Sequence, residues 1–216
     1  MKKCLIYIYL LLLTSLCCLQ AGAVSSEIRS LSVSDGLPDL IINTIYKDSK
    51  GYVWMGTNTS VERFDGIRLE HYMVEGSNEN LKRVFALVEM PGNELWVGTG
   101  MGLFRLADDA EKLERLAPEM ITSGVHAFCK LGDVLYVGTE KGLYVYKGGV
   151  FEHVLVDKNI FSRANFVTGM VEGENGILWL STMGGLKSLR LSDQSITSFS
   201  DKLAKNGQNL SFYNIT

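Results

Sequence analysis

The chain has 216 residues, a formal net charge of -3, 46% hydrophobic residues and 21% charged residues. This is the composition of a packed globular protein. The sequence contains no basic run that could neutralise a row of phosphates, so we expect no nucleic-acid partner.

The first residues predict an export signal. Lysines follow the initiating methionine, residues 5–16 form an apolar stretch too short to span a bilayer comfortably, and residues 21–23 read Ala-Gly-Ala. We therefore expect a signal peptide over residues 1–23, cleavage after Ala23, and an exported, periplasmic protein. An uncleaved membrane anchor is the alternative interpretation of the same stretch.

The cysteine content fits an exported domain that is held together by its core. Three of the four cysteines lie in the signal segment, which leaves Cys129 alone in the mature chain. No intramolecular disulfide can therefore form after cleavage. Because Cys129 follows the apolar residues 125–128, we interpret it as a small buried hydrophobic side chain.

Beyond the signal segment, one unit repeats. A motif of an aromatic residue, small residues and a threonine recurs four times, at intervals of 42, 40 and 43 residues. Repeats of this period are typical of propellers and other repeat arrays. The residues that define the motif are Trp54, Gly56, Thr57, Trp96, Gly98, Thr99, Gly102, Leu103, Tyr136, Gly138, Thr139, Gly142, Leu143, Trp179, Thr182, Gly185 and Leu186.

Each period contains about four short apolar runs, separated by clusters of Gly, Pro, Asn and Asp that are typical of tight turns. That is the content of one propeller blade. A charged patch at residues 108–115 has only a weak helical tendency. We therefore predict an all-β fold, a β-propeller over residues 24–216 whose four-stranded blades lie near residues 38–73, 81–116, 124–156 and 165–200.

The motif has a physical rationale in a blade. The aromatic ring can fill the wedge between neighbouring blades. The glycine lets the next blade approach closely, and the threonine with the following Gly-x-Gly begins a hairpin turn that needs positive φ angles. In the first copy Ser60 replaces the last glycine, so that turn is either strained or of another type.

The two ends of the repeat array indicate a partial propeller. Residues 27–33 resemble the last strand of a blade, and residues 211–216 resemble the first strand of a fifth blade. Propellers close with about four to eight complete blades. We therefore expect an incomplete ring, present as an N-terminal fragment of a longer protein.

Residues 35–66 carry Asp-Gly-Leu-Pro, then Gly-Tyr-Val-Trp-Met-Gly-Thr and Phe-Asp-Gly, and residues 96–103 and 179–186 repeat the Trp-x-Gly-Thr-x-x-Gly-Leu core with Ser181 as a mild departure. This pattern resembles the two-component regulator propeller repeat family. The resemblance implies the periplasmic sensor region of a hybrid two-component histidine kinase of the Bacteroidetes type. It also implies an inner-membrane anchor, a homodimer when complete, further blades and kinase domains beyond this chain, and oligosaccharide ligands.

No catalytic, metal or cofactor site is expected from the residues. The histidines His71, His126 and His153 have no partner at metal-ligand spacing, and no nucleophile elbow or phosphate loop is present. We interpret the three tryptophans as core residues and not as sugar platforms. Ligand contacts are expected on the variable connections between blades, at residues 35–39, 77–82, 117–124 and 158–165.

These observations predict a ligand-sensing module and not an enzyme. The alternatives are an exported propeller enzyme that acts on polysaccharide, of the lyase or quinoprotein type, and a scaffold propeller that binds only protein. The enzyme would need a convergent catalytic set, and none is visible in these blades.

Overall fold

The structure, a computed structural model, describes residues 30–74 and 81–199. The chain divides into two compact units, Met1–Leu31 and Ser32–Thr216, and the second contains every described strand. The expected signal peptide and the expected fifth-blade strand at residues 211–216 lie outside the described residues. Within the described ranges, no helix is both long enough and apolar enough to cross a membrane.

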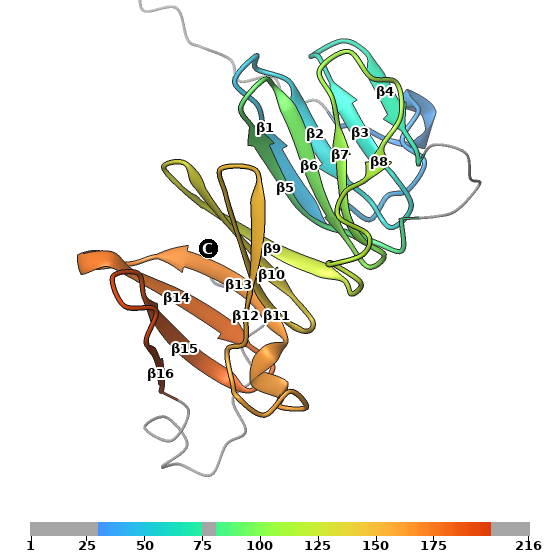
Figure 1. Ribbon diagram of the computed structural model, residues 1–216. Helices are drawn as coiled ribbons and strands as arrows, with labels where there is room; N and C mark the ends of the chain where they lie inside the picture. Colours follow the sequence, from blue (N-terminus) through green and yellow to red (C-terminus); the bar gives the residue numbers. More distant parts are fainter. Residues whose placement is uncertain (1–29, 75–80, 200–216) are drawn as a thin grey trace, which may run out of the picture. The chain divides into compact units, whose positions relative to one another are not determined.

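Four antiparallel sheets, each of four strands, follow one another along the chain (Figure 1). The first contains β1 (Thr44–Lys47), β2 (Val53–Gly56), β3 (Val61–Phe64) and β4 (Leu69–Tyr72). The second contains β5 (Val84–Met90), β6 (Glu94–Thr99), β7 (Gly102–Leu106) and β8 (Glu114–Arg115). The third contains β9 (Val125–Leu131), β10 (Val134–Thr139), β11 (Gly142–Lys147) and β12 (Val150–Val154). The fourth contains β13 (Val167–Glu172), β14 (Ile177–Thr182), β15 (Gly185–Arg190) and β16 (Ile196–Ser198).

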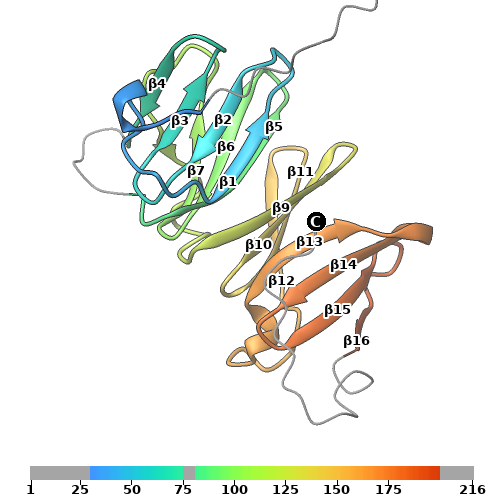
Figure 2. The same cartoon turned by 180° about the vertical axis from the view of Figure 1, so that it is seen from behind.

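Within each sheet the strands lie in chain order, and each pairs with the next (Figure 2). The first strands of successive sheets, β1, β5, β9 and β13, contact one another in sequence. The predicted all-β propeller class is therefore confirmed, as an open series of blades among the described residues. One sheet falls within each of the four predicted blade ranges.

Short segments differ from the sequence expectations. Val33, expected in a strand, begins the 3₁₀ turn η2 (Val33–Asp35), because the Ser32 and Asp35 side chains close a capping box around it. The charged residues 108–115, by contrast, agree with their weak helical tendency: they contain no helix and end in the two-residue β8. Two further 3₁₀ turns, η3 (Arg163–Asn165) and η4 (Glu174–Gly176), precede and follow β13.

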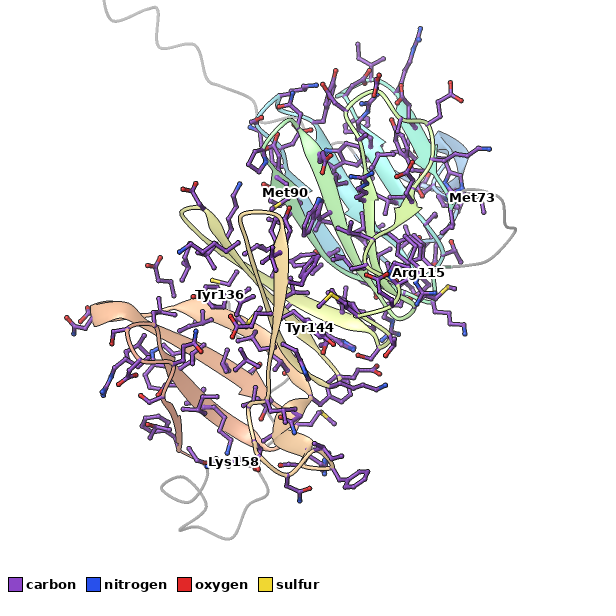
Figure 3. The ribbon with its side chains drawn as sticks, in the orientation of Figure 1. Met73, Met90, Arg115, Tyr136, Tyr144 and Lys158 are labelled. Carbon is purple, nitrogen blue, oxygen red and sulfur yellow. The ribbon has the colours of Figure 1, made fainter. Side chains whose placement is uncertain are left out.

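Three apolar clusters fill the spaces between successive sheets. Trp54 is buried between the first and second sheets, and Trp96 between the second and third. Tyr136 packs against the third cluster with the fourth sheet, while Tyr144 of the same sheet lies in the second cluster (Figure 3). Trp179 is only half-buried and contacts Phe199, with ring centroids 5.1 Å apart. The motif aromatic of each of the first three sheets thus packs towards the following sheet.

A glycine–valine contact joins successive sheets. A Cβ atom added to Gly98 on β6 would lie 2.8 Å from Cγ1 of Val125, the first residue of β9. Ordinary Cβ atoms do not approach a neighbour this closely, so glycine is required for the approach. The contact recurs between Gly56 and Val84 and between Gly138 and Val167, with distances of 2.5 and 2.8 Å.

The motif threonine organises the turn that follows it. Thr99 Oγ1 donates to the carbonyl of Gly102 at 3.0 Å and accepts from the Met101 amide at 3.1 Å. Gly102 takes a φ of 126°, in the region that favours glycine. In the first repeat Ser60 has no positive φ, and its amide donates to Thr57 Oγ1 at 3.0 Å. That turn is of another type, which settles the alternative left open by the sequence.

The glycine–valine contact predicts a specific energetic coupling. Gly98→Ala should lower the free energy of unfolding by about 1–3 kcal/mol, because the new methyl group overlaps Val125. Val125→Ala alone should also destabilise the chain by leaving a cavity. The double substitution should cost clearly less than the sum of the two, since each relieves the other. Urea or thermal denaturation of the four proteins measures this, and strict additivity would contradict the proposed contact.

Candidate functional site

Three of the four first strands begin with a β-bulge. In β9 the register passes from Ala127 opposite Gly138 to Val125 opposite Thr139, so His126 is the extra residue. The same irregularity makes Phe85 the extra residue of β5 and Thr168 that of β13. A bulge re-aims the side chain of its extra residue, and all three of these side chains line one cavity.

The first sheet contributes the equivalent residue without a registered bulge. Thr44 pairs with Gly56 as Ala86 pairs with Gly98, so Asn43 occupies the position of Phe85. The backbone amide of Asn43 donates to the Gly56 carbonyl at 2.8 Å. Each sheet therefore places one residue of different chemistry at the same position, and the four are Asn43, Phe85, His126 and Thr168.

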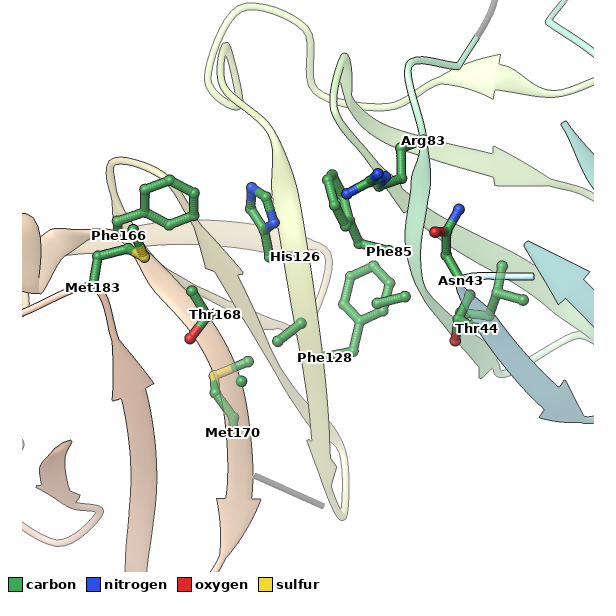
Figure 4. Close-up of a pocket in the computed structure, with 14 residues that line it drawn as sticks. Asn43, Thr44, Arg83, Phe85, His126, Phe128, Phe166, Thr168, Met170 and Met183 are labelled. Carbon is green, nitrogen blue, oxygen red and sulfur yellow. The ribbon is translucent and has the colours of Figure 1, made fainter. Parts of the chain in front are cut away.

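The cavity has a volume of about 640 Å³ and lies along the beginnings of β1, β5, β9 and β13 (Figure 4). Small-molecule sites commonly occupy about 300–1,000 Å³ and combine apolar walls with a few polar groups. The volume of this cavity falls within that range, and its lining combines apolar and polar side chains. Besides the four equivalent residues, it includes Arg83, Phe128, Phe166, Met170 and Met183.

Three rings form a row along the cavity. The Phe85 and His126 ring centroids are 4.1 Å apart, and those of His126 and Phe166 are 4.8 Å apart. The Arg83 guanidinium carbon lies 5.8 Å from the Phe85 centroid, at one end of the row (Figure 4). A row of ring faces and edges beside a cation suits a ligand that has a flat apolar face and a polar edge.

His126 lies at the centre of this row and is largely enclosed, with its side chain 12% exposed. Burial lowers its pKa, and the neighbouring Glu140 carboxylate opposes that effect. The His126 Nε2 atom lies 3.2 Å from Glu140 Oε1. A neutral imidazole hydrogen-bonded in this way leaves its other nitrogen available as an acceptor.

A polar cluster adjoins the cavity where the first and second sheets meet. Asn58 Nδ2 donates to Asp39 Oδ2 at 2.8 Å, and Asn43 Nδ2 donates to Asn58 Oδ1 at 3.1 Å. Arg83 Nε points to the same Asn58 oxygen at 3.4 Å. Hydrogen bonding from the Ile41 amide lowers the pKa of Asp39, so the carboxylate at the end of this chain is charged.

The described residues of the connections where the sequence predicted ligand contacts lie beside the cavity and are not among its lining residues. The connections 117–124 and 158–165 precede β9 and β13. In the connection 35–39, Asp39 accepts a hydrogen bond from Asn58, which in turn accepts one from the cavity residue Asn43. Of the connection 77–82, the structure describes Leu81 and Lys82, and Lys82 directly precedes Arg83 of the cavity lining. In the described chain the cavity is formed by the first residues of β1, β5, β9 and β13 and by residues directly before them, such as Arg83 and Phe166.

The histidines are dispersed, and only His126 reaches the cavity. His71 pairs with Glu62, which is fully enclosed on β3, and burial raises the pKa of that carboxyl. His153 stacks on Tyr144 with ring centroids 4.6 Å apart. Among residues 30–74 and 81–199, no group of three or more His, Cys, Asp or Glu is arranged to hold a metal ion.

Blades of this build, joined through buried aromatic and glycine residues, define a β-propeller protein. Residues 36–59 match the family described as two component regulator propeller. This segment is one copy of the repeat that the sequence resemblance indicated. None of the curated proteins matches the chain.

Solved structures share the fold. The extracellular domain of a B. thetaiotaomicron protein described as a hybrid two component system has a TM-score of 0.67 and 23% identity, over 79% of this chain and 26% of that chain. A second B. thetaiotaomicron extracellular domain, described as part of a one component system, has a TM-score of 0.63 and 21% identity, over 74% and 21%. Virginiamycin B lyase from Staphylococcus aureus has a TM-score of 0.57 and 16% identity, over 74% and 56%. The chain thus spans about a quarter or less of the two extracellular domains.

The enclosure of His126 predicts its titration. Its pKa should lie below the ordinary value of about 6.5, because burial disfavours the charged imidazolium, and Glu140→Gln should lower it further by removing the opposing charge. Because the pKa of His126 is then lower in the folded chain than in the unfolded chain, the unfolded chain binds the imidazole proton more readily than the folded chain does. The contribution of His126 to stability is thus present above pH ~6.5 and is lost as pH falls towards the folded pKa.

Two-dimensional NMR of the imidazole signals measures this pKa. Glu174→Gln, an exposed substitution in η4 at the other end of β13, serves as the matched control and should leave the His126 titration unchanged. A His126 pKa at or above 6.5 would show that the ring is hydrated and that the cavity is not enclosed there.

Proposed function

We propose that the chain is a ligand-sensing propeller module of an exported two-component sensor, and that its ligand binds in the cavity at the beginnings of the first strands. The observation that carries the proposal is the set of four equivalent positions, which project four chemically different side chains into one cavity. The repeat match and the likeness to extracellular domains of bacterial sensor systems support the sensor role. Output would come from domains outside this chain.

The ligand is a glycan fragment in this proposal. Sugar rings offer flat C–H faces that pack on aromatic side chains and hydroxyl edges that require hydrogen-bond partners. The cavity supplies the row of Phe85, His126 and Phe166 for the sugar faces and the side-chain amide of Asn43 for the hydroxyl groups. The periplasmic location expected from the N-terminal signal would give the module access to such fragments.

Binding without turnover is the favoured interpretation, because the repeat match and the likeness to extracellular domains of sensor systems support a sensor role. An exported lyase is the second candidate. Its specific support is the hydrogen bond between His126 and Glu140, since a histidine oriented by a carboxylate can act as a general base. Mass spectrometry for unsaturated products after incubation with polysaccharides separates the two readings, because a sensor releases none.

Isothermal titration calorimetry of the chain with a panel of oligosaccharides tests the binding site. Phe85→Ala should weaken binding of any oligosaccharide ligand about tenfold, equivalent to about 1.4 kcal/mol, by removing a stacking face. Phe161→Ala is the matched control: this ring is 88% exposed on the connection 158–165 and should leave affinity unchanged.

The reverse pattern would place the ligand on the connections, as the sequence alone suggested. If no oligosaccharide of the panel releases or absorbs heat, the glycan part of the proposal fails.

A further inference from the structure

We propose that Arg83 recognises a carboxylate on the ligand and that Asn58 positions it, so the cavity selects ring compounds that carry an acid group. This inference rests on the proposed function and names the ligand class of the same cavity.

Arg83 lies at the end of the ring row and has no ion pair among the described residues. Three of the six other described arginines pair with carboxylates: Arg63 with Glu70, Arg105 with Glu114 and Arg190 with Asp193. The Arg83 guanidinium lines the cavity beside Phe85 (Figure 4). Among the described residues, only its Nε atom is directed at a protein acceptor, at 3.4 Å. The terminal N–H groups remain for a carboxylate, which a guanidinium binds in a bidentate manner.

Asn58 holds Arg83 through a relay of hydrogen bonds. Its side-chain oxygen faces Arg83 Nε and accepts from Asn43, while its amide group donates to Asp39. The donation to Asp39 fixes which end of the Asn58 amide faces Arg83. The other three repeats carry Gly100, Glu140 and Met183 at the position of Asn58. The departure of the first repeat from the motif therefore provides this relay.

The backbone that carries Arg83 is strained. Lys82 and Arg83 are consecutive non-glycine residues with positive φ, at 49° and 73°. Hydrogen bonds hold them there: the Arg83 amide donates to the Asn58 carbonyl at 2.8 Å, and the Gly100 amide donates to the Arg83 carbonyl at 3.0 Å. The equivalent residues before β9 and β13, Gly124 and Phe166, have no positive φ. Strain of this kind concentrates where a side chain must be presented in one direction.

These contacts together define the ligand class. The ring row accepts the face of a ring, and Arg83 stands at one end of that row, where a substituent on the ring would reach it. The substituent that best matches a fixed guanidinium fork is a carboxylate. A uronic acid is the sugar that combines both features.

Calorimetry of the full chain with two matched probes tests this. The α-1,4-linked galacturonate trisaccharide should bind at least tenfold more tightly than the corresponding neutral galactose trisaccharide, and the difference should shrink at high salt. Arg83→Gln should abolish the preference by weakening the acid trisaccharide far more than the neutral one, and Arg83→Lys should retain part of the preference. Arg190→Gln, which removes an exposed ion pair on the β15–β16 turn, is the control and should change neither affinity.

Asn58→Ala tests the positioning role. The variant should reduce the acid-to-neutral preference severalfold, mainly by weakening binding of the acid trisaccharide, and the Arg83 Nε–Hε NMR signal should shift towards the position of a solvent-exposed arginine. An unchanged preference together with an unchanged signal would overturn the role of Asn58. Melting temperatures of all variants show whether a loss of preference reflects a loss of fold.

Phenylacetate, a ring carboxylate that is not a sugar, separates the two proposals. If it binds in an Arg83-dependent manner and neither trisaccharide binds, carboxylate recognition stands and the glycan ligand fails. If both trisaccharides bind equally, or if Arg83→Gln keeps the preference, the inference on Arg83 is overturned while the glycan sensor stands. If none of the three probes binds, both proposals are overturned.

Discussion

The contact between a motif glycine and the valine that opens the next sheet determines where everything else in this propeller lies. Because Gly98 has no Cβ, Val125 can pack directly against the strand of the preceding sheet. Val125 pairs with Thr139 and directly precedes the bulged residue His126, so the contact fixes the point at which His126 leaves the regular strand pairing. The wedge-filling Trp54 and Trp96 then stabilise a spacing that the glycines already set.

The same constraint separates two kinds of residue within each repeat. Residues that pair in the ladder or pack between sheets are held by neighbours on both sides, as Thr99 is by its two hydrogen bonds in the turn. The bulged residues Phe85 and His126 make no register pair: their rings contact each other, and His126 also contacts Phe166 and Glu140. Residues that hold a blade together and residues that line the cavity therefore follow one another directly along the same strand and do not lie in separate segments.

This alternation explains what the sequence could predict. The blades were recognisable because aromatic, glycine and threonine residues recur at one spacing, and each has a role that few other side chains can fill. A bulge has no comparable signature in composition: Phe85 reads as one more apolar strand residue. His126 reads as isolated because Glu140 approaches it only across the β9–β10 hairpin. Asn58 reads as a flaw in the motif, since its partners Asp39 and Arg83 are distant in the chain.

The bulges also bear on how such a protein can change. A residue whose backbone stands outside the ladder and whose side chain faces a cavity can be exchanged with little effect on pairing, whereas an exchange at Gly98 or Thr99 disturbs a whole blade. Each added blade brings one more such position at a fixed place in the ring. Duplication of the repeat therefore extends the surface of the cavity by one independently variable side chain at a time, and the chemistry of that surface can change by substitution without a new fold.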